Sequence, residues 1–220
     1  MPERLGILGG TFDPVHMGHL RIAEEAVDQL RLDGLLFIPA ASPPHKVDRV
    51  FESFQHRCSM LQAAIAENPR FTLSTVEQEI SGRSYTVATL RRLHARASRC
   101  IEYYFLVGMD SFLELDTWWR YKELFQLARI VILGRPGYPL ADVLEVLRRM
   151  ISPLYEAGQD GATFFHPHLL PVHALRSTLL EISSTGIRQL LASGRSIRYL
   201  VPQSVLSYIG AHALYRPSEP

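Results

Sequence analysis

Short apolar runs and amphipathic stretches alternate along most of the chain. The apolar runs have the length and composition of buried strands, and the stretches between them carry apolar residues at helical spacing. Strands that alternate with helices predict a parallel sheet with helices on both faces, an α/β doubly wound architecture. The expected strands lie at 5–8, 35–38, 71–75, 103–107, 130–133 and 175–182, and the expected helices near 17–31, 53–67, 85–98, 120–128, 140–150, 184–193 and 202–214.

Length and composition fit one compact domain. With 220 residues the chain can bury a large core, and we expect a single Rossmann-like domain over 1–220. C-terminal helices at about 184–214 would complete it. Hydrophobic residues make up 47% and charged residues 20% of the chain, so its composition is that of an ordinary globular protein.

Charge and cysteine content exclude several classes of protein. Lys and Arg number 23 against 22 Asp and Glu, and a net charge of +1 argues against a nucleic-acid partner. Cys58 and Cys100 have no metal-ligand spacing and form no disulfide framework, as is typical of a reducing compartment. Since neither a signal peptide nor an apolar run of about 18 residues is found, we expect a cytoplasmic protein without a membrane span. A monomer and a homo-oligomer are both compatible with this composition.

Residues 9–20 read Gly-Gly-Thr-Phe-Asp-Pro-Val-His-Met-Gly-His-Leu, directly after the first expected strand. Gly9 and Gly10 allow the backbone to approach a ligand without Cβ atoms in the way. An amphipathic helix begins near Met17, and its N-terminus offers free N–H groups and the positive end of the helix dipole. The segment therefore predicts a phosphate-binding site at the end of the strand.

Two histidines belong to the same segment. His16 and His19 are three residues apart, so both project from one side of the first helical turn. Gly18 between them costs the helix about 1 kcal/mol relative to Ala, and we expect it to keep space open for a ligand. The spacing matches neither the Walker A loop, nor the dinucleotide Gly-x-Gly-x-x-Gly, nor the zinc pair His-Glu-x-x-His. We therefore assign no metal-ligand set; a divalent ion on either histidine is the alternative.

A second cluster, Pro-Ala-Ala-Ser-Pro-Pro-His-Lys at 39–46, follows the second expected strand. Its prolines would pre-order the loop at low entropy cost and hold His45 and Lys46 near the glycines. A flexible ammonium suits phosphates whose charge moves during a reaction. The alternatives are a stiff connecting loop or, less well supported, a proline-rich ligand segment.

A third cluster, Glu-Ile-Ser-Ser-Thr-Gly-Ile-Arg, lies at 181–188. Ser183, Ser184 or Thr185 can cap the helix that follows. Arg188 then lies in or near the first turn, where the helix dipole disfavours a cation. A polyphosphate bound by both the N–H groups and the guanidinium explains this placement; a cap with a chance surface Arg is the alternative.

Two further stretches could bind an aromatic, anionic ligand. Ser84, Tyr85 and Thr86 open a helix, with Thr86 as its candidate cap. Trp118 and Trp119 follow a strand that ends at Gly108, and an indole can stack on a pyridine ring while backbone N–H groups bind a carboxylate. Core packing is the alternative for either tryptophan.

These segments together resemble a known family. Residues 9–20 resemble the Thr/His-x-Gly-His element of the nucleotidyltransferase superfamily, and Ile-Ser-Ser-Thr-x-Ile-Arg at 182–188 resembles its second motif, which contacts the triphosphate. With His16 in the first position and Pro14 before it, the version here is most similar to the bacterial nicotinate mononucleotide adenylyltransferases. The resemblance runs from Gly9 to about Ile209.

The resemblance implies an activity and a set of site residues. The activity is transfer of AMP from ATP to nicotinate mononucleotide, with Mg²⁺ accompanying ATP and pyrophosphate leaving. Trp118 is the closer match to the tryptophan that stacks on the pyridine ring, and Trp119 would then mainly support the fold. The implied catalytic residues are His16, His19, Lys46 and Arg188; the implied ATP-binding residues are Gly9, Gly10, Thr11, Phe12, Gly18, Gly108, Asp110, Ile182, Ser183 and Ser184; and the implied acceptor-binding residues are His45, Ser84, Tyr85, Thr86 and Trp118.

Two other functions stay open at this point. The acceptor could be a different phosphate, such as nicotinamide mononucleotide (NMN) or phosphopantetheine. The chain could also be a nucleotide-binding regulator without turnover, although such a sensor has no need of His16, His19, Lys46 and Arg188 together.

Overall fold

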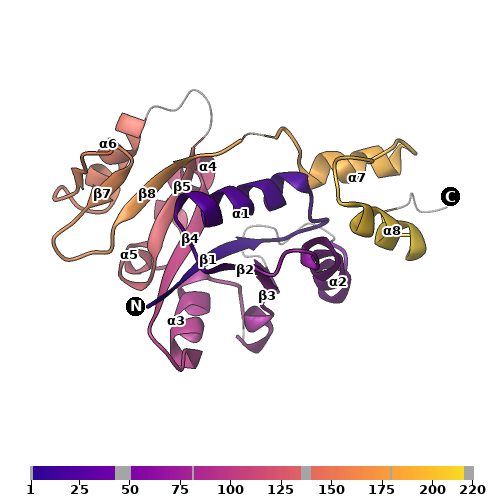
Figure 1. Cartoon of the computed structure of the whole chain (residues 1–220), viewed down its shortest axis with the longest axis horizontal. Helices are drawn as coiled ribbons and strands as arrows, with labels where there is room; N and C mark the ends of the chain where they lie inside the picture. The colour runs from indigo at the N-terminus through magenta and orange to yellow at the C-terminus, as the bar shows by residue number, and fades with distance from the viewer. Residues whose placement is uncertain (1, 43–50, 81, 135–139, 179, 216–220) are drawn as a thin grey trace.

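The computed structural model describes residues 2–42, 51–80, 82–134, 140–178 and 180–215. Within these ranges one eight-stranded sheet runs through the molecule in the order β3-β2-β1-β4-β5-β8-β7-β6 (Figure 1). Six strands are parallel, whereas β6 and β7 form an antiparallel hairpin on one edge. The strands are β1 Glu3–Gly10, β2 Gly34–Pro39, β3 Phe71–Leu73, β4 Ile101–Gly108, β5 Arg129–Gly134, β6 Glu156–Ala157, β7 Thr163–Phe165 and β8 Val172–Arg176.

Helices cover both faces of the sheet, as the alternating pattern predicts. One core layer lies between the sheet and helices α3 to α6, and the other between the sheet and α1, α2, α7 and α8. In Figure 1, α7 and α8 lie near α2 at one end of the molecule and α6 lies at the other. The helices are α1 Met17–Gln29, α2 Phe54–Ile65, α3 Thr86–Arg96, α4 Met109–Leu113, α5 Leu124–Leu127, α6 Leu140–Met150, α7 Ser184–Ala192 and α8 Gln203–Ala211.

The strand order reverses between β1 and β4. The chain moves outward from β1 through β2 to β3, then returns to place β4 on the other side of β1. In such sheets, a crevice for ligands forms beyond the carboxyl ends of the strands at this reversal. Those ends are Gly10 of β1 and Gly108 of β4, so the glycine-rich segment enters the crevice directly.

The structure corrects the expected sheet in two places. The hairpin β6–β7 was not expected, because its strands have two and three residues and give no periodicity. The strand expected at 175–182 is wrong: β8 ends at Arg176, and the chain leaves the sheet before α7 begins. Thr178 there donates from its N–H and its hydroxyl to the Glu25 carboxylate on α1. These bonds take the place of a strand partner, although Leu and Ile at 179–182 keep the sequence strand-like.

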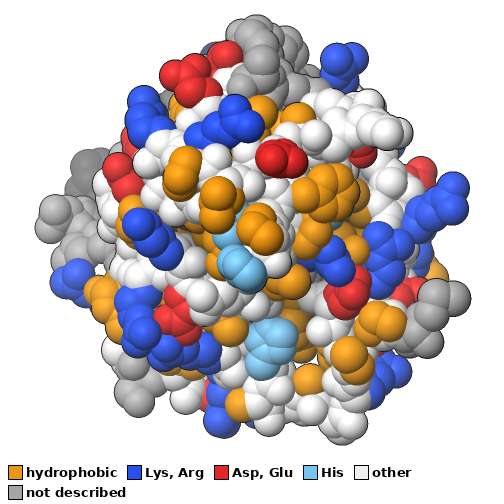
Figure 2. Space-filling model, turned by 90° about the vertical axis from the view of Figure 1, so that its left-hand side faces the viewer, with side chains coloured by type: hydrophobic (Ala, Val, Ile, Leu, Met, Phe, Trp, Pro, Cys, Tyr) orange, Lys and Arg blue, Asp and Glu red, His pale blue; other side chains and the backbone are white. Residues whose placement is uncertain are grey.

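The end of the molecule that carries α6 and β7 has a mixed surface. Figure 2 shows basic and acidic side chains of this face interspersed, with apolar patches between them. Among the helices of the described ranges, none combines the length and the apolar character needed to cross a membrane.

Candidate active site

Residues 9–20 connect the end of β1 to the first turn of α1. Phe12 has a positive φ of 51°, and its ring lies 3.1 Å from where a Cβ on Gly10 would be. A Cβ on Gly18 would lie 3.0 Å from His16 Nδ1. The space above Gly18, expected to be open for a ligand, thus also accommodates the His16 ring. Both glycines are required by close packing inside the segment.

His16 and His19 lie together at the start of α1. Their rings stack with centroids 3.7 Å apart, and the His16 backbone N–H donates to His19 Nδ1 over 3.2 Å. This bond makes Nδ1 an acceptor, so a neutral His19 carries its proton on Nε2. Burial lowers the pKa of His16 to about 4, so its ring is neutral near pH 7. His16 therefore acts there through hydrogen bonds and not as a cation.

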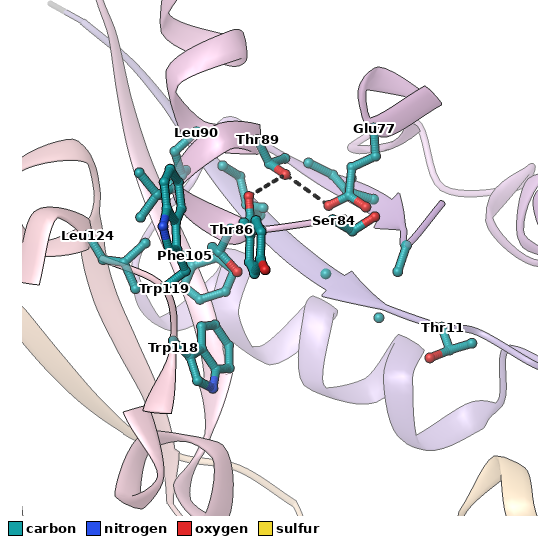
Figure 3. A pocket seen from close by; sticks show the side chains of 17 residues that line it. Thr11, Glu77, Ser84, Thr86, Thr89, Leu90, Phe105, Trp118, Trp119 and Leu124 are labelled. Carbon is teal, nitrogen blue, oxygen red and sulfur yellow. Dashed lines mark hydrogen bonds between the residues drawn. The ribbon is translucent and has the colours of Figure 1, made fainter. Parts of the chain in front are cut away.

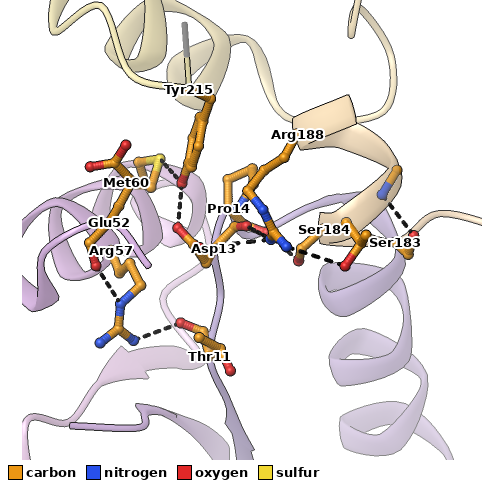
Figure 4. A network of polar contacts seen from close by, with 12 residues as sticks. Thr11, Asp13, Pro14, Glu52, Arg57, Met60, Ser183, Ser184, Arg188 and Tyr215 are labelled. Carbon is orange, nitrogen blue, oxygen red and sulfur yellow. Dashed lines mark hydrogen bonds and ion pairs between the residues drawn. The ribbon is translucent and has the colours of Figure 1, made fainter. Parts of the chain in front are cut away.

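Side chains from distant parts of the chain fix the loop at 11–14, which Figure 4 shows from close by. The buried Arg57 on α2 donates to the Thr11 carbonyl over 2.7 Å and to the Ala40 carbonyl over 2.9 Å. On α7, the Ser184 hydroxyl donates to the Pro14 carbonyl over 2.9 Å. Because side chains from α2 and α7 bond the Thr11 and Pro14 carbonyls, the 11–14 loop is preorganised before any ligand binds.

Arg188 on α7 points at the same loop. Its Nη1 donates to the Asp13 carbonyl over 2.6 Å, and its Nη2 donates to Thr185 Oγ1 over 3.2 Å. Ser183 is the N-cap of α7 and accepts from the Gly186 N–H over 3.1 Å. The third sequence cluster therefore docks on the first, although the two lie at opposite ends of the chain.

The first and third clusters enclose a cavity of about 450 Å³, which we call the polar cavity. Both histidines and Arg188 line it, together with backbone from the carboxyl ends of β1, β4 and β5. Its lining residues are Gly10, Thr11, Phe12, Asp13, His16, Gly18, His19, Ile22, Phe51, Gly108, Leu133, Gly134, Ser177, Leu180, Ile182, Ser183, Ser184, Thr185 and Arg188.

A second cavity, of about 270 Å³, adjoins the first, and we call it the aromatic cavity. Figure 3 shows the two indoles at one end and Thr11 at the other. Gly10 and Thr11 line both cavities, so the two meet at the carboxyl end of β1. Its lining residues are Ile7, Gly9, Gly10, Thr11, Ile38, Ala40, Glu77, Ser84, Tyr85, Thr86, Val87, Thr89, Leu90, Phe105, Trp118, Trp119 and Leu124.

The N-terminus of α3 opens into the aromatic cavity. Tyr85 is the N-cap and Thr86 the first helical residue, which corrects the expectation that Thr86 caps this helix. The Ser84 hydroxyl instead accepts from the Ser42 N–H over 2.9 Å. This bond ties the start of the helix to the segment that follows β2.

The two tryptophans differ in environment. Trp118 is half-buried and packs edge-on against Phe105 of β4, with ring centroids 6.3 Å apart. Trp119 is 45% exposed and lies tilted over Tyr85, at 5.1 Å between centroids. Both line the cavity, so the structure does not separate the two tryptophans by position, and the assignment of Trp118 to the ring stays a prediction.

Three of the predicted site residues are not among the lining residues of these cavities, two of them because the structure does not describe them. His45 and Lys46 fall outside the described residues. Asp110 is exposed on the short helix α4 and lines neither cavity, whereas Gly108, two residues earlier, lines the polar cavity. The other predicted residues line one cavity or the other.

Sequence reasoning missed three residues that build the site. Glu77 is buried in the wall of the aromatic cavity, where it accepts from the Thr89 hydroxyl over 2.9 Å and from the Ala41 N–H over 3.1 Å. Arg57 and Tyr215 bond the 11–14 loop. Arg57 gives a weak signal, since it is a cation in the otherwise apolar core stripe of α2.

The described residues hold no group of three or more His, Cys, Asp or Glu side chains arranged to bind a metal ion. Asp13 is the one carboxylate lining the polar cavity within the ranges that the structure covers. Its Oδ1 already accepts from the Tyr215 hydroxyl over 2.7 Å. A cation in this cavity would therefore depend mainly on ligands other than the protein.

Comparison with known proteins agrees with this geometry. A family model described as cytidylyltransferase-like matches residues 7–190. A protein of Syntrophotalea carbinolica named probable nicotinate-nucleotide adenylyltransferase is 46% identical over 98% of this chain and 99% of its own length. A protein of the same name from Geotalea uraniireducens is 45% identical over 96% and 98%.

Solved structures share the fold. Nicotinic acid mononucleotide adenylyltransferase of Plasmodium falciparum, solved in complex with NaAD, superposes with a TM-score of 0.71 over 97% of both chains, at 18% identity. A putative nicotinate-nucleotide adenylyltransferase of Vibrio parahaemolyticus gives 0.64 at 17% identity over 98% and 97%. The chain therefore belongs to the cytidylyltransferase-like family and, within it, to the nicotinate-nucleotide adenylyltransferases.

Proposed function

We propose that this protein transfers AMP from ATP to nicotinate mononucleotide, giving nicotinic acid adenine dinucleotide and pyrophosphate. The observation that carries this proposal is the meeting of two unlike cavities at Gly10 and Thr11. The polar cavity suits a polyphosphate, and the aromatic cavity suits a flat ring. Membership in the nicotinate-nucleotide adenylyltransferases supports this pair of substrates.

In the reaction, an oxygen of the acceptor's 5′-phosphate attacks the α-phosphorus of ATP. The bond between that phosphorus and the oxygen bridging to the β-phosphate breaks in line, and pyrophosphate takes the electron pair. Such a transfer needs no covalent enzyme intermediate, because positioning and charge stabilisation supply most of the catalysis. The shared wall at Gly10 and Thr11 is the place where the two phosphates would meet.

The polar cavity supplies the groups for the ATP side. His16, which is neutral near pH 7, and His19 would hydrogen-bond the α-phosphate and the departing oxygens. Arg188 would neutralise the β- and γ-phosphates, as would Lys46, which lies outside the described residues. The N-terminus of α7, with Ser183 and Ser184, would also bind the triphosphate. Gly108 would lie near the nucleoside of ATP.

ATP would enter as its Mg²⁺ complex. Asp13 Oδ1 is bonded by Tyr215 and the remaining lining groups are neutral or cationic, so phosphates and water would supply most of the ligands. The ion would offset charge on the leaving pyrophosphate.

The aromatic cavity would hold the acceptor. The backbone N–H groups at the start of α3, near Thr86, would bind the nicotinate carboxylate, with Ser84 and Tyr85 beside them. Trp118 would stack on the pyridine ring. His45, which lies outside the described residues, is a further candidate for binding the acceptor.

Pyrophosphate release from MgATP, with nicotinate mononucleotide beside NMN, tests this function. Charge-assisted hydrogen bonds are about twice as strong as neutral ones, so N–H groups near Thr86 should favour the acid at least tenfold in kcat/KM. Equal turnover of NMN would refute the acceptor assignment. Turnover with phosphopantetheine alone would show that the enzyme uses another acceptor. Binding of ATP without pyrophosphate release in the presence of any of these acceptors would indicate a regulator without turnover.

A further inference from the structure

Tyr215 connects the C-terminal part of the described chain to the 11–14 loop. Its hydroxyl donates to Asp13 Oδ1 over 2.7 Å across 202 positions of sequence (Figure 4). The residue follows α8 and packs against the core layer beneath α2, where Met60 Sδ lies 4.0 Å from the hydroxyl. Tyr215 lines neither cavity, and its hydrogen bond to Asp13 is the contact that joins it to a residue of the polar cavity.

Asp13 connects Tyr215 to the polar cavity. Its side chain is buried, and Oδ2 lies 3.7 Å from Arg188 Nη1 without a hydrogen bond among the described residues. The same guanidinium nitrogen donates to the Asp13 carbonyl over 2.6 Å. A buried carboxylate is costly unless donors surround it. If the Tyr215 hydroxyl were lost, the nearest strong donor for the carboxylate would be Arg188.

We propose that Tyr215 is a positioning residue of the ATP site: its hydroxyl satisfies the Asp13 carboxylate and thereby leaves the Arg188 guanidinium directed at the polyphosphate. The inference rests on the proposed function, because it assigns the polar cavity to ATP. It adds a residue from the segment after α8 to a site whose main parts come from β1, α1 and α7.

The phenol is suited to this role, because it stays protonated, and therefore a hydrogen-bond donor, around neutral pH. Burial and the bond to Asp13 raise the pKa of Tyr215 far above its usual value. The nearby Tyr208 offers a matched comparison, since its hydroxyl bonds His56 Nδ1 over 3.0 Å between α8 and α2. It lines neither cavity, so its bond is structural only.

The test compares Tyr215→Phe with Tyr208→Phe, each of which removes one hydrogen-bonded hydroxyl. We expect Tyr215→Phe to lower kcat/KM for ATP about tenfold while the KM for nicotinate mononucleotide stays within about twofold. Tyr208→Phe should leave both constants unchanged. Thermal unfolding of the two variants measures the structural cost of each lost bond, so a loss of stability is not read as a loss of positioning.

A double-mutant cycle tests whether Tyr215 acts on the ATP site through Arg188. If Tyr215 acts through Asp13 on Arg188, adding Tyr215→Phe to Arg188→Lys should cost less than about twofold further. Independent, multiplicative effects would overturn the proposal, as would kinetics of Tyr215→Phe that equal those of Tyr208→Phe. An equal rise in the KM of both substrates would overturn it too, because it would indicate a general shift of the loop.

Calorimetric titration with MgATP alone separates this proposal from the proposed function. Weaker MgATP binding by Tyr215→Phe would support the positioning role even if nicotinate mononucleotide were not the acceptor. Unchanged MgATP binding and kinetics, in a protein that does turn over nicotinate mononucleotide, would refute the role of Tyr215 and leave the function standing.

Discussion

The two cavities are built in opposite ways. The polar cavity depends on a short loop whose backbone carbonyls accept hydrogen bonds from Arg57, Ser184 and Arg188. The aromatic cavity is bounded mainly by apolar and ring side chains from β1, β2, α3 and the segment after α4, with polar side chains such as Glu77 and Ser84 in its wall. Fixed polar groups suit bond breaking, since they stabilise developing charge without reorganisation. An aromatic wall suits selection of a ring by shape and stacking.

We therefore expect the polar cavity to govern turnover and the aromatic cavity to govern the choice of acceptor. Substitutions in the first should therefore change kcat, or the constants for ATP, most strongly. Substitutions in the second should change the constants for the acceptor.

The largest effect is expected for His19. His19→Ala should lower kcat about 10²-fold or more with little change in the KM for ATP, because the lost hydrogen bond matters most in the transition state. His16→Ala should behave similarly. Steady-state kinetics with saturating acceptor measure both constants.

His19→Asn separates a structural role from a catalytic one. Asn places an acceptor near the former Nδ1 and can still bind the His16 N–H, but it has no group at Nε2. Loss of activity in Asn as well as Ala supports a catalytic role for Nε2. Full activity of His19→Asn would mean that His19 only caps the start of α1. It would also weaken the contrast between the two cavities.

The next effect concerns Arg188. Arg188→Lys should lower kcat/KM for ATP by roughly 30-fold, because an ammonium cannot keep the bond to the Asp13 carbonyl and also bind phosphate with a planar fork. The exposed Arg195, just after α7, provides the control as Arg195→Lys. If both variants are equally active, Arg188 only joins α7 to the loop.

The smallest effect is expected in the aromatic cavity. Trp118→Ala should raise the KM of nicotinate mononucleotide and of NMN about tenfold and preserve their ratio, because stacking does not distinguish acid from amide. Trp119→Ala should change either KM less than about threefold and cost little stability, since the side chain is 45% exposed. A larger rise for Trp119→Ala would make Trp119 the stacking residue.

Sequence reasoning found the polar cavity more completely than the aromatic one, for a physical reason. The phosphate segment is local: two glycines, two histidines and a helix start follow one another, and each residue type has a distinct use. Trp118 and Trp119 are neighbours in the chain, and nothing in the sequence around them tells them apart. Only their packing separates them, since Trp118 contacts Phe105 and Trp119 contacts Tyr85. Alternation predicted the parallel strands and the helices on both faces of the sheet, whereas the short strands of the β6–β7 hairpin carry no period.

Long-range polar contacts could not be predicted from the sequence pattern. Arg57 reads as a helix residue and Tyr215 as part of a helical end, and nothing local links either to the 11–14 loop. Such pairs form because the fold buries a carbonyl or a carboxylate that then needs a donor. They become visible only when the elements are placed in space.

The bond between Asp13 and Tyr215 also sets an order of events during synthesis. The ribosome makes the 11–14 loop near the start of translation, but the hydroxyl that satisfies Asp13 is added 202 residues later. At 5–20 residues per second, this separation lasts roughly 10–40 s. For most of that time the loop can pair with Arg57 but not with Arg188 or Tyr215. We therefore expect the complete set of contacts around the loop to form only near the end of chain growth.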